Sequence, residues 1–151
     1  MPRLFYFLRQ KWVPPEDPEV SFKAKNVIVT DANTGLGFET AAKFVALGAS
    51  QVILSVRDIT KGDHAKLVIE QRTGKKDQVK VWQLDMNSYD SIRNFTKRAS
   101  SLDHIDVAVL NAGVYKVTYE ESRYGWEETL QVNVLSTALI GLLLLQKNEG
   151  F

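Results

Sequence analysis

The chain has 151 residues, 44% of them hydrophobic, which is enough for one domain with its own core. Its 19 basic and 18 acidic residues give a net charge of +1 and form no long block of one sign, so we expect no nucleic-acid partner. The absence of cysteine excludes disulfides and thiolate metal sites. It also fits a reducing compartment, and we expect a cytoplasmic location and no metal.

Residues 1–21 are expected to form an N-terminal arm and a proline-rich linker. The apolar run at residues 4–8 is shorter than the core of a signal peptide, which needs about 7–15 residues. We interpret it as a short helix or arm that docks on the domain, with a membrane-touching anchor as the alternative. Pro14, Pro15 and Pro18 then break regular structure, so the domain is predicted to occupy residues 22–151.

Apolar runs alternate with amphipathic segments along this domain. Short β-branched runs predict buried strands over residues 26–30 and 51–56, and further strands follow over 79–84 and 105–110. Helices are predicted after the first strand, ending at Gly48, and over about 60–72, 88–99 and 125–147. This alternation predicts an α/β fold: the N-terminal part of a doubly wound, Rossmann-type parallel sheet with right-handed crossovers.

The most apolar stretch, residues 134–145, lies in the last predicted helix. A membrane span needs about 20 such residues, and polar Asn133 and Gln146 bracket this one. We therefore expect no membrane span here, but a buried or interface helix through which the chain could form a homo- or hetero-oligomer.

A glycine-containing loop, Thr-Asp-Ala-Asn-Thr-Gly-Leu-Gly at residues 30–37, joins the first strand to the first helix. Such a turn lets the backbone approach a pyrophosphate, which accepts hydrogen bonds from the first helical turn. Two glycines alone are weak evidence, and their placement at this junction strengthens it. Asp85 and the triplet 111–113 also follow strands, where ligands of open α/β sheets bind, whereas Asn133 lies inside the last helix.

These motifs resemble those of the short-chain dehydrogenase/reductase family, particularly its fungal members in secondary-metabolite pathways and their retinol-dehydrogenase-like relatives. The loop is similar to the family's Thr-Gly-x-x-x-Gly-x-Gly, residues 111–113 match its Asn-Ala-Gly, and Asn133-Val134 matches its catalytic asparagine. The resemblance covers about residues 22–145. It implies an incomplete dinucleotide-binding domain of an oxidoreductase that acts on a ketone or an alcohol as its small-molecule substrate.

The resemblance also assigns roles to single residues. Asp85 would bind the adenine ring, Asn111 would lie beside the adenine ribose, and the backbone N–H of Leu36 would donate to the pyrophosphate. Simpler interpretations stay open: Asp85 could cap the following turn, Asn111 could be a turn residue, and Asn133 could bond to neighbouring backbone. The full set of expected cofactor-binding residues is Thr30, Asn33, Thr34, Gly35, Leu36, Gly37, Arg57, Lys61, Asp85, Asn111, Ala112 and Gly113.

The end of the second strand indicates which dinucleotide is preferred. Arg57 comes first after the strand and Lys61 follows, and a guanidinium suits a 2′-phosphate better than a hydroxyl. Relatives with this Arg-Asp arrangement generally use NADP(H), so NADP is the predicted cofactor. Asp58 is the counter-argument, because an acid near this position would bind the ribose hydroxyls of NAD.

The family's proton donor, a tyrosine four residues before a lysine, does not occur in the sequence. Tyr89 and Tyr119 are each followed four residues later by an arginine, and the family's position would fall beyond residue 151. Hydride transfer to a carbonyl leaves an alkoxide that needs such a donor. We therefore expect a fragment that is inactive as it stands; a non-catalytic nucleotide-binding or interaction module is the alternative. An exposed edge at the fourth strand and poor solubility or obligate association are expected as well.

Asp31 stands where the family has its first glycine. Glycine allows positive φ at a tight turn, and a substitute costs about 1 kcal/mol, somewhat less for aspartate. A carboxylate about 5 Å from a phosphate would cost up to ~3 kcal/mol at an effective dielectric of ~20. If the side chain turns toward water instead, this penalty shrinks. The sequence leaves both arrangements open.

Overall fold

Four parallel strands form one sheet at the centre of the molecule. The computed structural model describes residues 20–148, so the arm expected over residues 1–21 lies almost entirely outside the described residues. The strands are β1 (Asn26–Thr30), β2 (Gln51–Val56), β3 (Val79–Gln83) and β4 (Val107–Val109), in the order β3-β2-β1-β4. All of their pairings are parallel.

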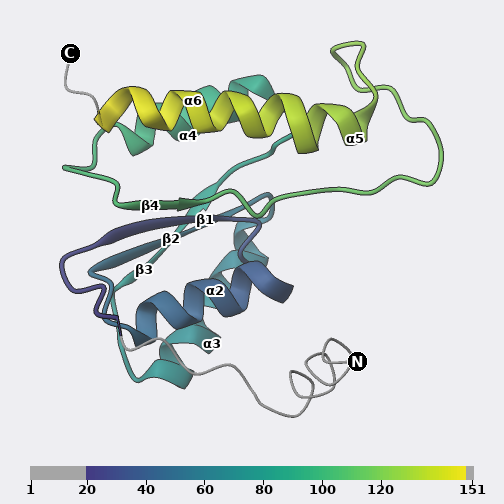
Figure 1. Cartoon of the computed structure of the whole chain (residues 1–151). Coiled ribbons are helices and arrows are strands. Elements are labelled where there is room, and N and C mark those ends of the chain that lie inside the picture. Colours follow the sequence, from purple (N-terminus) through teal and green to yellow (C-terminus); the bar gives the residue numbers. More distant parts are fainter. Residues whose placement is uncertain (1–19, 149–151) are drawn as a thin grey trace, which may run out of the picture.

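Helices cover both faces of this sheet. Figure 1 shows α2 (Gly35–Ala46) and α3 (Ile59–Thr73) on one face, with α4 (Tyr89–Ala99) and α6 (Thr137–Asn148) on the other. Each face has its own apolar core: Val27 and Val29 pack toward α2 and α3, and Ile28 packs toward α4 and α6. This division follows from the two-residue repeat of a strand. The predicted doubly wound α/β fold is confirmed.

The fourth strand is shorter than predicted. It covers three residues in place of the six expected over 105–110, and among the described residues it pairs with β1 alone. Its side chains are exposed or only half-buried, whereas four of the five in β1 are buried. An open groove of about 660 Å³ runs beside it, lined by Ala108, Leu110 and, from α6, Gly141 and Leu144. Within residues 20–148 the expected exposed sheet edge is confirmed.

The last helix begins later than predicted and is not uniform. Gly125, expected as its first residue, adopts a φ of 78° in a turn. Helical structure starts with α5 (Glu128–Leu130), continues as the π-helical segment η1 (Gln131–Ser136) and then as α6. Glu127 caps it by accepting hydrogen bonds from the N–H groups of Thr129 and Leu130, and these bonds lower the pKa of its carboxyl.

The helical run Glu128–Gln146 is long and apolar enough to cross a membrane by length and composition. From the sequence we expected no membrane span, because the apolar stretch at residues 134–145 is shorter than the about 20 residues that a span needs; the helix itself is longer than that stretch. This finding is weak evidence for a span, because core helices of soluble proteins pass the same test. Here Ile140 and Leu144 are buried in the core cluster on the α4 side of the sheet.

Candidate functional site

The glycine loop lies beyond the carboxyl end of β1 and leads into α2. Thr34 is the extended N-cap of the helix, and Gly35 follows with a φ of 58°. Asp31 also adopts a left-handed backbone, with a φ of 52°, and its N–H donates to the Ser55 carbonyl at 2.8 Å. This left-handed conformation is the one that glycine adopts most readily. Aspartate tolerates this region better than most residues do.

Gly37 is where the first turn of α2 approaches the loop most closely. A Cβ atom added there would lie 2.5 Å from the Asp31 carbonyl oxygen and 2.6 Å from the Asn111 amide nitrogen. That amide donates to the Thr30 carbonyl at 3.0 Å and to the Asp31 carbonyl at 3.4 Å. Asn111 therefore ties the end of β4 to the glycine loop, a contact that its position at a strand end did not specify.

Thr30 forms the second link between β1 and the segment after β4. Its fully buried hydroxyl accepts a hydrogen bond from the Ala112 N–H at 2.9 Å and donates to the Val109 carbonyl at 3.4 Å. The hydroxyl thus fixes the distance between the glycine loop and the Asn-Ala-Gly segment. Thr30 is placed to hold the site together rather than to line it.

Replacing Thr30 by valine is expected to lower the free energy of unfolding by about 1–3 kcal/mol, because the Ala112 N–H loses its acceptor while the side-chain shape is kept. Thr30→Ser is the matched control, since it keeps the hydroxyl and loses one methyl, at a cost of about 0.8 kcal/mol. Urea unfolding measures both. A valine variant as stable as the wild type would contradict this role.

Asp85 is placed at the end of β3, where it performs the simpler role left open above. One carboxylate oxygen accepts a hydrogen bond from the Asn87 N–H at 2.9 Å, so the side chain caps the turn before α4. The Asp85 N–H donates to the Ser91 hydroxyl at 2.9 Å. The Asn87 amide in turn donates to Glu128 at 2.6 Å, and Glu128 pairs with Lys116 at 2.9 Å. The turn after β3 is thus connected to the start of the last helix.

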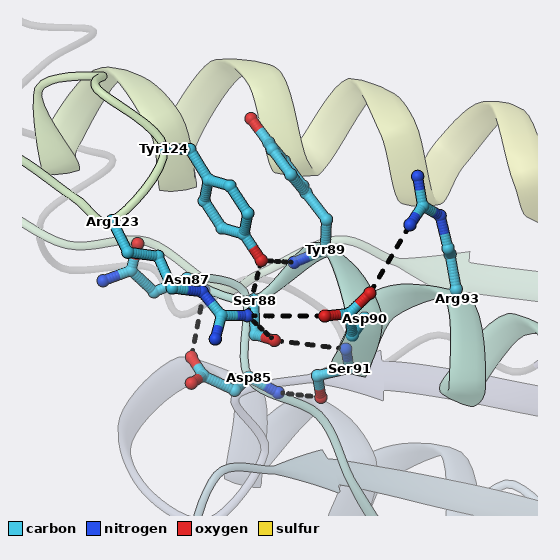
Figure 2. A network of polar contacts seen from close by, with 9 residues as sticks. All are labelled: Asp85, Asn87, Ser88, Tyr89, Asp90, Ser91, Arg93, Arg123 and Tyr124. Atoms are coloured by element: carbon cyan, nitrogen blue, oxygen red, sulfur yellow. Dashed lines mark hydrogen bonds and ion pairs between the residues drawn. The ribbon is translucent and has the colours of Figure 1, made fainter.

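Arg123 and Tyr124 fasten the long β4–α5 connection to the same turn, and sequence reasoning did not identify them. Figure 2 shows the Arg123 guanidinium donating to the Ser88 hydroxyl at 2.7 Å, with Asp90 3.8 Å away. The Tyr124 hydroxyl accepts a hydrogen bond from the Tyr89 N–H at 3.1 Å. Ser88 is itself the N-cap of α4. No local pattern reveals these contacts, because the partners lie 35 residues apart.

Asn133 lies in the π-helical segment and clamps the backbone after Gly113. Its side-chain oxygen accepts the Val114 N–H and its amide donates to the Val114 carbonyl, each at 2.8 Å. A Cβ atom on Gly113 would lie 3.3 Å from the same oxygen. The structure therefore has Asn133 bonding to backbone, as the simpler interpretation expected, at a helical irregularity of a kind often found at functional sites.

A pocket of about 480 Å³, open solvent included, lies beyond the carboxyl ends of the strands. Of the predicted residues it brings together four: Arg57, Asp85, Ala112 and Gly113. The other predicted residues do not line it. Its lining also includes residues outside the predicted cofactor-binding set, namely Asp31, Ser55, Leu84, Met86, Asn87, Val114, Glu128 and Val132.

The residues after β2 separate into two roles. Asp58 is the N-cap of α3, and its carboxylate accepts the Lys61 N–H at 3.2 Å. Arg57 is exposed and lines the pocket, whereas Lys61 is exposed and does not line it. The carboxylate that argued for NAD is therefore engaged in capping a helix.

The short-chain dehydrogenase family model matches residues 25–148, more than four fifths of the chain. The chain belongs to the short-chain dehydrogenase family. Its relatives include the short-chain dehydrogenase/reductase phmF of Phaeosphaeria nodorum, which is 49% identical over 136 residues. That match covers 89% of this chain and 40% of phmF, so the chain spans about two fifths of the length of this curated relative.

Solved structures agree with this short-chain dehydrogenase assignment. An uncharacterized protein from Mycobacterium paratuberculosis superposes with a TM-score of 0.72 at 34% identity, covering 85% of this chain and 44% of that one. A metagenomic short-chain oxidoreductase in complex with NADP superposes with a TM-score of 0.67 at 25% identity, over 83% of this chain and 55% of its own. The described residues thus correspond to about half of a short-chain dehydrogenase fold.

Proposed function

We propose that these residues are the NADP-binding part of a short-chain dehydrogenase/reductase that acts on a ketone or an alcohol, as in the secondary metabolism of fungi, in the cytoplasm. The observation that carries the proposal is the pocket beyond the strand ends, in which the arginine after β2 and the aspartate after β3 lie together with Ala112 and Gly113. Ligands of doubly wound sheets bind at this edge.

The residues present fit a dinucleotide. Gly37 lets the first turn of α2 pack directly against the loop proposed to hold the pyrophosphate, since a Cβ atom there would lie 2.5 Å from the Asp31 carbonyl oxygen. Within residues 20–148 the buried Ser55 hydroxyl has no hydrogen-bond partner, and since Ser55 lines the pocket we propose that this hydroxyl bonds to a polar atom of the ligand. Arg57 supplies the positive charge that a 2′-phosphate requires. When bound, NADP would supply the hydride chemistry.

The proposed roles follow the layout of the site. The pyrophosphate would lie at the N-terminus of α2, the adenine near Asp85, and the 2′-phosphate near Arg57 and Lys61. Asn111, Ala112 and Gly113 would form the side toward β4, and Thr30 would support them. The loop residues proposed at the pyrophosphate are Asn33, Thr34, Gly35, Leu36 and Gly37.

Asn133 is the one residue of the family's catalytic set that the sequence supplies, and we propose that it positions the segment after Gly113 through its two bonds to Val114. No tyrosine stands four residues before a lysine in these 151 residues. An asparagine does not provide the proton that carbonyl reduction needs. The proposal is therefore nucleotide binding without turnover by this chain alone.

Calorimetric titration of the purified chain with NADPH and, separately, with NADH tests the proposal. NADPH is expected to bind more tightly, and Arg57→Gln to weaken NADPH about 10–100-fold while changing NADH little, because a charge-assisted hydrogen bond contributes about 1.5–3 kcal/mol. Lys76→Gln, an exposed cation that does not line the pocket, is the matched control. Tighter binding of NADH would contradict the NADP preference. NADPH oxidation by the chain with any of a panel of ketones would contradict the proposed inactivity.

We also propose that the chain associates with a second copy through its last helix. Four large apolar side chains are exposed along α5, η1 and α6: Leu130, Val134, Leu142 and Leu145. Successive members of this set are separated by three, four or eight residues. Side chains at this spacing share one helix face. Continuous apolar faces of this kind are typical of interfaces.

A further inference from the structure

Asp31 lines the pocket that also receives the residues at the end of β2. It lines the same pocket as Arg57 and Ser55, and its N–H bonds to the Ser55 carbonyl near the end of β2. The first turn of α2, where a pyrophosphate would be bound, does not contribute to that lining. Of the two consequences that an acid here could have, the structure therefore favours an effect on the ribose end of the ligand.

We propose that Asp31 sets nucleotide selectivity by opposing Arg57. Its carboxylate would repel a 2′-phosphate and have little effect on an unphosphorylated ribose, so that the chain prefers NADPH over NADH only weakly. This inference rests on the proposed function, because it concerns the same pocket. Asp31 would then weaken the binding of NADPH selectively, rather than the binding of every dinucleotide.

The local structure leaves the carboxylate available for this role. Asp31 is exposed, and within residues 20–148 its side chain makes no hydrogen bond or ion pair, not even with Arg57. The backbone accommodates the residue at a φ of 52°. An unpaired carboxylate and a guanidinium lining one small pocket exert opposite fields on any phosphate between them. The effect on a neutral ribose is far smaller, which is why the two dinucleotides respond differently.

Asp31→Asn is the sharpest test, since asparagine keeps the size and the tolerance for a left-handed backbone and removes only the charge. We expect NADPH affinity to rise about tenfold, equivalent to ~1.4 kcal/mol, and NADH affinity to change less than about twofold. Adenosine 2′-monophosphate and adenosine, which have no 5′-phosphate, are expected to differ in the same way: the first gains affinity and the second does not. Asp63→Asn, an exposed carboxylate on α3 that does not line the pocket, controls for net charge.

The outcomes separate the two proposals. Equal gains for NADPH and NADH, with none for adenosine 2′-monophosphate, would place the charge at the pyrophosphate and overturn the selectivity role while leaving dinucleotide binding intact. Unchanged affinities for all four ligands would also overturn it. Failure of the wild type, Asp31→Asn and Asp31→Gly to bind any nucleotide would overturn the proposed function, and this inference with it.

Discussion

Gly37→Ala is expected to reduce NADPH affinity at least ~100-fold and to lower the free energy of unfolding by about 1–3 kcal/mol. The added Cβ would lie 2.5 Å from the Asp31 carbonyl oxygen and 3.2 Å from the Ala32 Cα, so rigid backbone must move. It would also lie 2.6 Å from the Asn111 amide, which holds the loop against β4. The loop would shift as a unit, and with it the backbone groups proposed for the pyrophosphate.

Gly141→Ala is the matched control for this variant. Both glycines are helical, so both substitutions gain about 1 kcal/mol in helix propensity. A Cβ on Gly141 would meet only the end of the Leu110 side chain, at 3.4 Å. Nucleotide calorimetry and urea unfolding compare the pair. A Gly37→Ala chain that binds NADPH as the wild type does would show that the close approach has no part in forming the site.

Leu142→Glu is expected to weaken self-association of the chain at least ~100-fold. Leu142 is 64% exposed on α6, within the apolar face proposed to meet a second copy. Burial of a leucine side chain contributes about 1.5–3 kcal/mol, and a two-fold interface would lose it twice while also burying charge. Sedimentation velocity over a range of concentrations measures the shift from dimer to monomer.

Leu67→Glu is the control for this prediction. Leu67 is 56% exposed on α3, which covers the opposite face of the sheet, so its replacement is expected to leave association unchanged. Equal effects from both glutamates would indicate a general gain in solubility rather than a specific interface. A wild-type chain that sediments as a single monomer and melts cooperatively would contradict the proposed association.

The strands β1 and β2 are the part of the fold that the sequence predicted best, whereas the order β3-β2-β1-β4 comes from the structure alone. β1 and β2 begin and end where their apolar runs do. Both strands are covered on two faces, so nearly every residue in them is buried and the whole strand is apolar in sequence. β4 was predicted too long, because Ile105 and Leu110 are apolar for packing rather than for strand pairing. Likewise, the start of the last helix is set by Glu127 as its cap, whereas the turn at Gly125 lies outside it.

The candidate site was predicted as a set of strand ends but not as a set of contacts. The motif spacing located Asp85 and Asn111 correctly, yet only the fold revealed that Asp85 caps a turn and that Asn111 bonds to the glycine loop. Ser55 and Glu128 belong to no motif and line the pocket because β2 and the last helix converge there. Such residues are recognisable only when distant segments are in contact.

Residue types and their spacing were enough to identify a short-chain dehydrogenase fold with a glycine loop, an arginine after the second strand and an aspartate in place of the first glycine. Those features depend on residue type and spacing, which a linear pattern records. The folded chain was needed to show where the carboxylates of Asp58 and Asp31 lie. Asp58 is committed to α3, whereas Asp31 shares a pocket with Arg57, because parallel strands bring residues of separate loops to one edge.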